Sequence, residues 1–92
     1  MHVDHYSSTI SCLPEVLLNI FYDIKKRDED PGAVVIHPDY KQILSEILDT
    51  TGDGCFTGVP IVYSDILVKW KENVIVLAGG FDGHYSIAYV QI

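Results

Sequence analysis

The segment AVVIHPDYKQILSEIL, residues 33–48, places two different apolar patterns next to each other. AVVI is a short consecutive apolar run, which is typical of a strand that is buried on both faces. Pro38 and Asp39 then suit a first helical turn. After them, apolar residues recur at the spacing of one helix face: Tyr40, Ile43, Leu44, Ile47 and Leu48. The segment therefore predicts an inner strand that leads directly into an amphipathic helix.

The flanking residues continue this alternation of helices and strands. Upstream, a helix is predicted from Leu13, and its basic last turn, Lys25 to Arg27, offsets the negative end of the helix dipole. Its inward face consists of Leu13, Leu17, Ile20, Phe21 and Ile24. Downstream, residues 58–67, 73–80 and 84–92 are predicted strands, and GGFDG at 79–83 is the hairpin turn between the last two.

This order of helix, strand, helix and three strands predicts an α+β fold. We expect two amphipathic helices packed on one face of a small mixed, mainly antiparallel sheet. A chain of 92 residues has room for one core, so residues 1–92 are predicted to form a single domain. Residues 1–10 are mostly polar, and a terminus of this kind is normally mobile.

The charge distribution narrows the class of partner. There are 13 Asp and Glu residues against 6 Lys and Arg residues, which gives a formal charge of -7. Direct nucleic-acid binding is disfavoured, because it needs clustered cations. An acidic surface favours solubility, or steers a protein toward a basic face of another protein. No apolar run is long enough for a membrane span, so no membrane partner is expected.

Two motifs resemble metal sites without completing one. Residues 49–60, DTTGDGCFTGVP, match the start of a calcium loop, but Pro60 stands where that loop needs a bidentate Glu. A surface turn is therefore the preferred interpretation. His2, Asp4 and His5 are possible ligands of a transition metal, although their terminal position favours solvated side chains.

The cysteines and the other histidines give only weak signs of catalysis. Cys55, His84 and Asp82 are the residue types of a thiol nucleophile, its base and an orienting carboxylate, but no nucleophile signature surrounds Cys55. Cys12 and Cys55 lie outside any CxxC motif and are predicted to be free thiols. His37 is expected to satisfy a helix-end donor or to pack on the core. The sequence predicts no catalytic residue, metal site or cofactor, and a small thiol or metal-assisted enzyme is the third hypothesis for function.

Taken in order, the phrases AVVIHPDY, LDTTGDG, FTGVPIVYSDIL, VIVLAGGF and HYSIA resemble the C-terminal portion of the tailed-phage major capsid protein family. The residues that carry the resemblance are Pro38, Leu48, Asp49, Gly52, Gly58, Pro60, Val62, Ser64, Gly80, Phe81, Tyr85 and Ile87. The arm, extended loop and spine helix of that family have no counterpart here, and Gly79-Gly80 stands where it often has Gly-Asp. The resemblance implies a phage or prophage accessory or assembly protein, located in the host cytoplasm or the virion.

The leading hypothesis is thus a non-enzymatic protein that binds another protein or a second copy of itself. The candidate binding residues are a strand face of Val62, Tyr63, Tyr85 and Tyr89 and the acidic run Asp28, Glu29 and Asp30. Alternatively, the aromatic residues fill the core beneath the helices, and the acidic run is a solvated loop. The second hypothesis is a small acidic inhibitor of a host defence system or nucleic-acid enzyme, in the manner of anti-CRISPR proteins.

Overall fold

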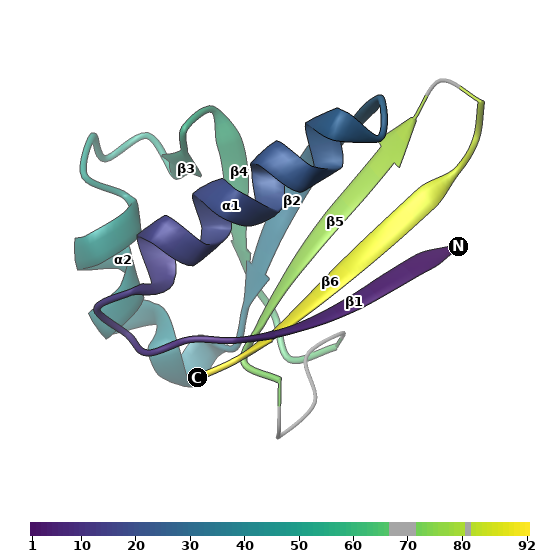
Figure 1. Ribbon diagram of the computed structural model, residues 1–92. Helices are drawn as coiled ribbons and strands as arrows, with labels where there is room; N and C mark the ends of the chain where they lie inside the picture. Colours follow the sequence, from purple (N-terminus) through teal and green to yellow (C-terminus); the bar gives the residue numbers. More distant parts are fainter. Residues whose placement is uncertain (67–71, 81) are drawn as a thin grey trace.

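The computed structural model describes residues 1–66, 72–80 and 82–92 (Figure 1). Helix α1 spans Leu13–Lys26, and helix α2 spans Lys41–Leu48 directly after the 3-10 turn η1, Pro38–Tyr40. Six strands in the described residues form one sheet: β1 (His2–Ser7), β2 (Glu29–Ile36), β3 (Cys55–Phe56), β4 (Val59–Tyr63), β5 (Val74–Gly80) and β6 (Tyr85–Gln91). The predicted α+β fold is confirmed.

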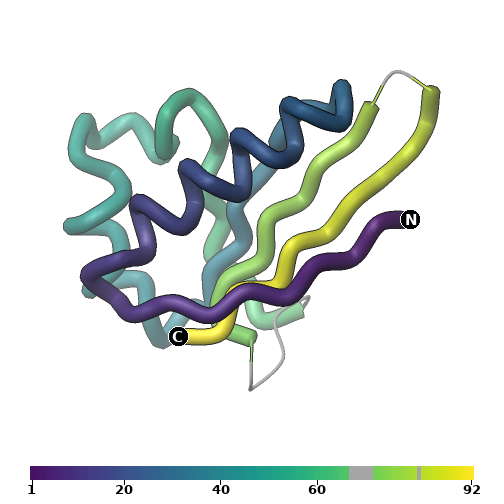
Figure 2. Tube along the Cα trace, in the orientation of Figure 1, coloured from purple at the N-terminus to yellow at the C-terminus, as the bar shows by residue number. Residues whose placement is uncertain are grey.

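The sheet is mixed, with the strand order β1-β6-β5-β2-β4-β3. β1 is parallel to β6 and β2 is parallel to β4, whereas the other three neighbouring pairs are antiparallel. The connections from β1 through α1 to β2, and from β2 through α2 to β4, step across the sheet in the same direction. Because such crossovers are right-handed, both helices cover the same face, as Figures 1 and 2 show.

The core lies between this helix-covered face and the two helices. All five predicted inward residues of α1 are buried: Leu13, Leu17, Ile20, Phe21 and Ile24. On α2 only Leu44 and Leu48 are fully buried, whereas Ile43 remains 48% exposed. The sheet contributes Val34, Ile36, Val59, Val74, Val76, Ala78, Ala88 and Val90. The inner position predicted for residues 33–36 is confirmed, since β2 lies between β5 and β4.

The predicted strand 58–67 is shorter in the structure. β4 ends at Tyr63, and Leu67 lies outside the described residues, as does Phe81 of the predicted hairpin turn. β4 forms a hairpin with β3, a strand that the sequence did not predict. The two residues between them, Thr57 and Gly58, have φ values of 50° and 84°, as the two central residues of a type I′ hairpin turn require.

A β-bulge at Gly32 interrupts the pairing of β2 with β5. Pro31 pairs with Ala78 and Ala33 with Leu77, so Gly32 is the extra residue between them. Side chains alternate across a strand, and one extra residue reverses which positions face the helices. After the bulge Val34 faces the helices, whereas before it the odd-numbered Glu29 does, opposite Gly80.

The N-terminal segment is a strand rather than the mobile end that the sequence suggested. Residues His2 to Ser7 pair with Ser86 to Gln91 in continuous register. His2, Asp4 and Tyr6 share the helix-covered face with Ser86, Ala88 and Val90, and the alternate residues of both strands face the other side. The N-terminal strand thereby forms one edge of the sheet.

Candidate functional site

A pocket of about 620 Å³ opens where the α1–β2 turn, the start of β1 and the β5–β6 hairpin meet. We call it the α1–β2 pocket. Its described lining consists of Met1, His2, Arg27, Asp28, Glu29, Asp82, His84 and Tyr85. Four lining residues are charged, and three of these are acidic.

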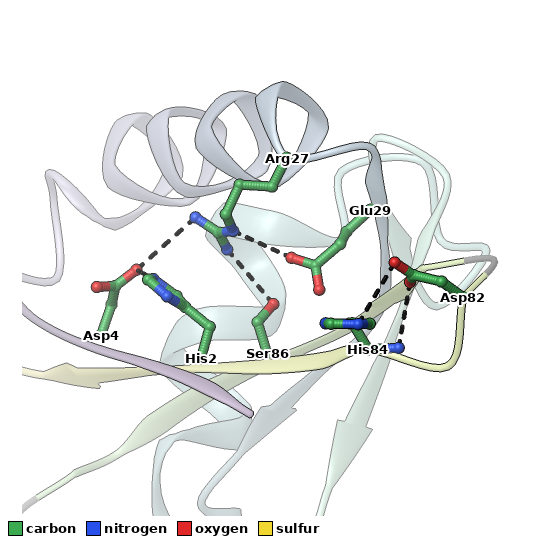
Figure 3. Close-up of polar contacts among 7 residues, drawn as sticks. All are labelled: His2, Asp4, Arg27, Glu29, Asp82, His84 and Ser86. Atoms are coloured by element: carbon green, nitrogen blue, oxygen red, sulfur yellow. Dashed lines mark hydrogen bonds and ion pairs between the residues drawn. The ribbon is translucent and has the colours of Figure 1, made fainter.

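Arg27, the single arginine of the sequence, organises the polar groups at this pocket (Figure 3). Its Nε donates to Oε1 of Glu29 at 3.0 Å, and its Nη2 donates to the Ser86 hydroxyl at 3.4 Å. Its Nη1 lies 3.9 Å from Oδ2 of Asp4, and the same oxygen contacts Nε2 of His2 at 2.8 Å. The guanidinium therefore joins the end of α1 to β2, β6 and β1.

Glu29 is the buried carboxylate of the pocket, with only 7% of its surface exposed. Oε1 is held by Arg27, and no described residue donates a hydrogen bond to Oε2. Figure 3 shows this second oxygen turned away from Arg27. Because Oε2 is not among the buried side-chain atoms without a partner, it keeps contact with solvent and can accept a hydrogen bond from water.

The α1–β2 turn places these residues. α1 ends at Lys26, and Asp28 adopts a left-handed φ of 57° that turns the chain back into β2. The exposed Lys25 and Asp30 form an ion pair across the turn. The bulge at Gly32 then sets Glu29 on the helix-covered face beside Arg27. Gly80, opposite Glu29, has no side chain to crowd it; a Cβ there would lie 3.4 Å from Cγ of Glu29.

Negative charge also surrounds the neighbouring part of β1. Burial raises the pKa of Tyr6, and the nearby carboxylates of Asp4 and Asp23 raise it further, while Arg27 opposes them. The helix-covered side of β1 is therefore acidic in spite of Arg27.

The opposite face of the sheet carries no helix in the described residues. Its centre is a small apolar cluster of Val35 and Ile75, packed by Leu77, Ile87 and Tyr89. At the end of the sheet nearest the α1–β2 pocket this face holds an apolar groove of about 460 Å³. Its described lining is Met1, Gly32, Leu77, Ala78, Gly79, Tyr85, Ser86 and Ile87. Met1 and Tyr85 line both this groove and the α1–β2 pocket.

The candidate residues of the predicted strand face are divided between the two sides of the sheet. Tyr63 lies on the helix-covered side against the core, beneath Lys41, whose Nζ lies 5.4 Å from the ring centroid. Tyr85 and Tyr89 lie on the helix-free face with Val62, and Tyr89 stacks on His5 at 5.2 Å between ring centroids. A single binding face of all four residues is therefore wrong, because neighbouring strand positions point to opposite sides.

The acidic run is also not a simple solvated loop. Glu29 and Asp30 are the first residues of β2, and Glu29 is buried beside Arg27. Only Asp28 belongs to the turn, and it lines the α1–β2 pocket. Glu29 is therefore part of the buried structure, whereas Asp28 and Asp30 are exposed.

The other candidate constellations are separated in the structure. Cys55 lies in β3 at one edge of the sheet, and three strands separate it from β6, which follows His84. Asp4 and His5 point to opposite faces of β1, and no cluster of ligands suited to a metal occurs in the described residues. Asp49 and Asp53 accept backbone hydrogen bonds from Gly54 and Cys55, which fits a turn.

Of the two roles predicted for His37, the structure shows the capping of a helix-end donor. Its Nδ1 accepts a hydrogen bond from the backbone N–H of Asp39 at 3.1 Å and so caps η1. The residues that sequence reasoning missed are Arg27 and Ser86. A single arginine next to three acidic residues was the available signal for Arg27, whereas nothing in the sequence marks Ser86 as its partner.

Comparisons with protein-family models, with curated proteins and with solved structures found no match. Among the described residues, no helix has both the length and the apolar character needed to cross a membrane.

Proposed function

We propose that this protein acts by binding another protein through the helix-free face of its sheet. The observation that carries the proposal is the one-sided architecture: two helices cover one face, and no helix or strand of the described chain covers the other. A sheet with a bare apolar face is usually covered by a second layer. A partner protein would supply that layer.

The composition of the helix-free face supports this role. Val3, Val62 and Tyr85 remain 41%, 44% and 67% exposed on it. Leu77, Ile87 and Tyr89 are half-buried between them and form a continuous apolar surface with the groove. Aromatic and aliphatic side chains of this kind are typical of the centre of a protein interface.

Charge supports a basic partner rather than a second copy of this chain. With a formal charge of -7, two copies repel each other, whereas a basic protein is attracted. We therefore place a heterologous protein with a basic surface on this face.

Two biological settings fit such an interaction. The resemblance to phage capsid proteins supports an accessory or assembly protein that binds other phage proteins. The acidic surplus supports an inhibitor of a host defence system or nucleic-acid enzyme, whose basic nucleic-acid groove is its target. Only for the inhibitor would nucleic acid compete with this protein, because both would occupy the same basic groove of the target.

The test compares exposed apolar residues on the two sides of the molecule. Val62→Ser and Tyr85→Ser alter the helix-free face, whereas Leu18→Ser and Ile43→Ser alter helix positions that are each 48% exposed. The immobilised variants are incubated with extract of the producing cells, and bound proteins are quantified by mass spectrometry. We expect a partner whose capture falls roughly tenfold for the two face variants and stays unchanged for the two helix variants.

Circular dichroism of each of the four variants serves as the control for folding. Equal capture by all four variants would contradict the proposal, because the helix-free face would then contribute nothing. Added DNA that displaces the partner would select the inhibitor setting.

A further inference from the structure

The apolar groove on the helix-free face lies where a glycine occupies the middle of three neighbouring strands. Asp30 of β2 pairs with Gly79 of β5, and Gly79 pairs with Tyr85 of β6. Paired residues of neighbouring strands point to the same face, so Asp30 and Tyr85 flank a position that has no side chain. Leu77 and Ile87, the next pair on this face, line the groove beside it. The missing side chain of Gly79 leaves room for an apolar group from outside.

The ring of Tyr85 forms a wall of this groove. A Cβ built on Gly79 would lie 3.7 Å from Cδ1 of Tyr85, so the edge of the ring lies next to the glycine. The lining is almost entirely apolar, which disfavours a charged occupant. Its volume of about 460 Å³ falls within the range of about 300–1,000 Å³ that is typical of ligand pockets. The groove can therefore take a large apolar side chain, and an aromatic ring would also pack against Tyr85.

Negative charge lies beside the groove. The side chain of Asp30 is 65% exposed, and its ion pair with the similarly exposed Lys25 is weak. Asp28 and Asp82, which are also exposed, line the adjoining α1–β2 pocket. An apolar side chain in the groove is consequently favoured when a neighbouring residue of the partner carries a positive charge.

We propose that the groove holds one aromatic side chain of the basic partner protein, and that a lysine or arginine next to it in the partner's sequence contacts Asp30. The groove then provides the apolar contact, and the acidic surroundings select a basic neighbour over an acidic one. This inference rests on the proposed protein-binding function and specifies the segment of the partner that is recognised.

The test titrates the full, isotope-labelled chain with three blocked pentapeptides, and NMR reports both affinity and location. The first peptide has the central triplet arginine-tryptophan-arginine. The second has alanine in place of tryptophan, and the third has citrulline, a neutral isostere, in place of both arginines. We expect the first to bind at least about tenfold more tightly than either of the others. It should shift the amide signals of Gly32, Leu77 and Gly79, which line the groove.

Gly79→Val fills the groove from within. Gly79 has no positive φ, and the atom nearest to an added Cβ would lie 3.6 Å away, so this strand position tolerates a side chain. We expect at least about tenfold weaker binding of the first peptide with an unchanged or higher Tm. Gly79→Ala, which adds only the Cβ, should give a smaller loss. Ser7→Val places valine on the same face at the other end of β1 and should change affinity less than about twofold.

Asp30→Asn tests the contact with the basic neighbour. It should weaken the first peptide about fivefold and change the affinity of the citrulline peptide less than about twofold. Glu46→Gln, on the exposed surface of α2, removes the same charge and should weaken the first peptide less than about twofold.

Three results would overturn the inference. Equal affinity for the peptides with tryptophan and with alanine would mean that the groove holds no aromatic anchor. Equal losses in Asp30→Asn and Glu46→Gln would mean general charge attraction. Free tryptamine that binds as tightly as the first peptide would assign the groove to a small molecule.

Partner capture distinguishes the failure of this inference from the failure of the proposed function. Capture that falls in Val62→Ser but not in Gly79→Val would leave the protein-binding function standing and remove the groove anchor. Capture that is unaffected by Val62→Ser, Tyr85→Ser and Gly79→Val would remove both.

Discussion

Tyr63 carries the one buried side-chain polar atom in the described residues that lacks a hydrogen-bond partner. Its ring packs against the core, and Lys41 lies over it. Burial raises the pKa of Tyr63, and the charge of Asp49 raises it further. The hydroxyl thus adds an uncompensated desolvation cost, while the ring contributes the packing.

We expect Tyr63→Phe to be neutral or to stabilise the fold by up to about 1 kcal/mol, because it removes only the unpaired hydroxyl. The measurement is urea unfolding at neutral pH, with the exposed Tyr22→Phe as a control of no effect. In the wild type, a raised pKa in the folded state means that unfolding releases a proton above about pH 10, so stability falls there as pH rises. Part of that loss should disappear in Tyr63→Phe; a clear destabilisation at neutral pH would show that the hydroxyl has a partner.

Glu29 illustrates what the sequence could not predict about the candidate site. Counting alternate positions back from Val34 and Ile36 puts Glu29 on the helix-free face. The bulge at Gly32 reverses that alternation and brings Glu29 to Arg27. A lone glycine in a strand is compatible with a bulge, but it does not require one. The acidic run was visible in the sequence, whereas its partition into buried and exposed members depends on this one insertion.

Strand β1 is a whole element that could not be predicted from the sequence. The sequence HVDHYS is less apolar than the other strands. β1 lies at the edge of the sheet with one neighbouring strand, so its side chains are less buried. Its partner β6 lies at the far end of the sequence. By contrast, α1, β2, β5 and β6 were predicted, since their apolar periodicity reflects local burial in the core. β3 was missed because a two-residue strand has no periodicity.

Hydrogen exchange followed by NMR tests the orientation of β1. The amides of Asp4, Tyr6 and Ser8 should exchange at least about tenfold more slowly than those of Val3, His5 and Ser7, because only the first set donates toward β6. Uniformly fast exchange across these six amides would contradict the pairing of β1 with β6. Ile75 and Val76 in the central strand β5 provide the protected reference.

Two opposing electrostatic effects, repulsion among acidic residues and attraction within ion pairs, determine how the stability of the fold responds to salt. The surplus of acidic residues produces repulsion that salt screens, whereas the ion pairs of Lys25 and Arg27 produce attraction that salt also screens. The Lys25–Asp30 pair is exposed and therefore weak, and the Arg27–Glu29 pair is partly shielded from salt. Repulsion should dominate.

Raising NaCl from about 20 mM to about 300 mM should therefore raise Tm by roughly 2–5 °C in differential scanning calorimetry. The double variant Asp39→Asn, Glu46→Gln lowers the surplus at exposed positions and should respond less to salt. A Tm that falls as salt rises would show that the ion pairs outweigh the repulsion.

The parallel pairing of β1 with β6 has a consequence for folding on the ribosome. His2 pairs with Ser86, so β1 cannot be paired in this sheet until β6, more than 80 residues later in the chain, has been synthesised. The β3–β4 hairpin and the packing of α1 on β2 can form earlier from neighbouring segments, whereas the sheet cannot be completed until β6 has emerged. Pairing between such distant segments is entropically demanding and slow. The nascent chain should therefore remain open at β1 until β6 has emerged, and a premature stop before Tyr85 would leave β1 without its only neighbour among the described strands.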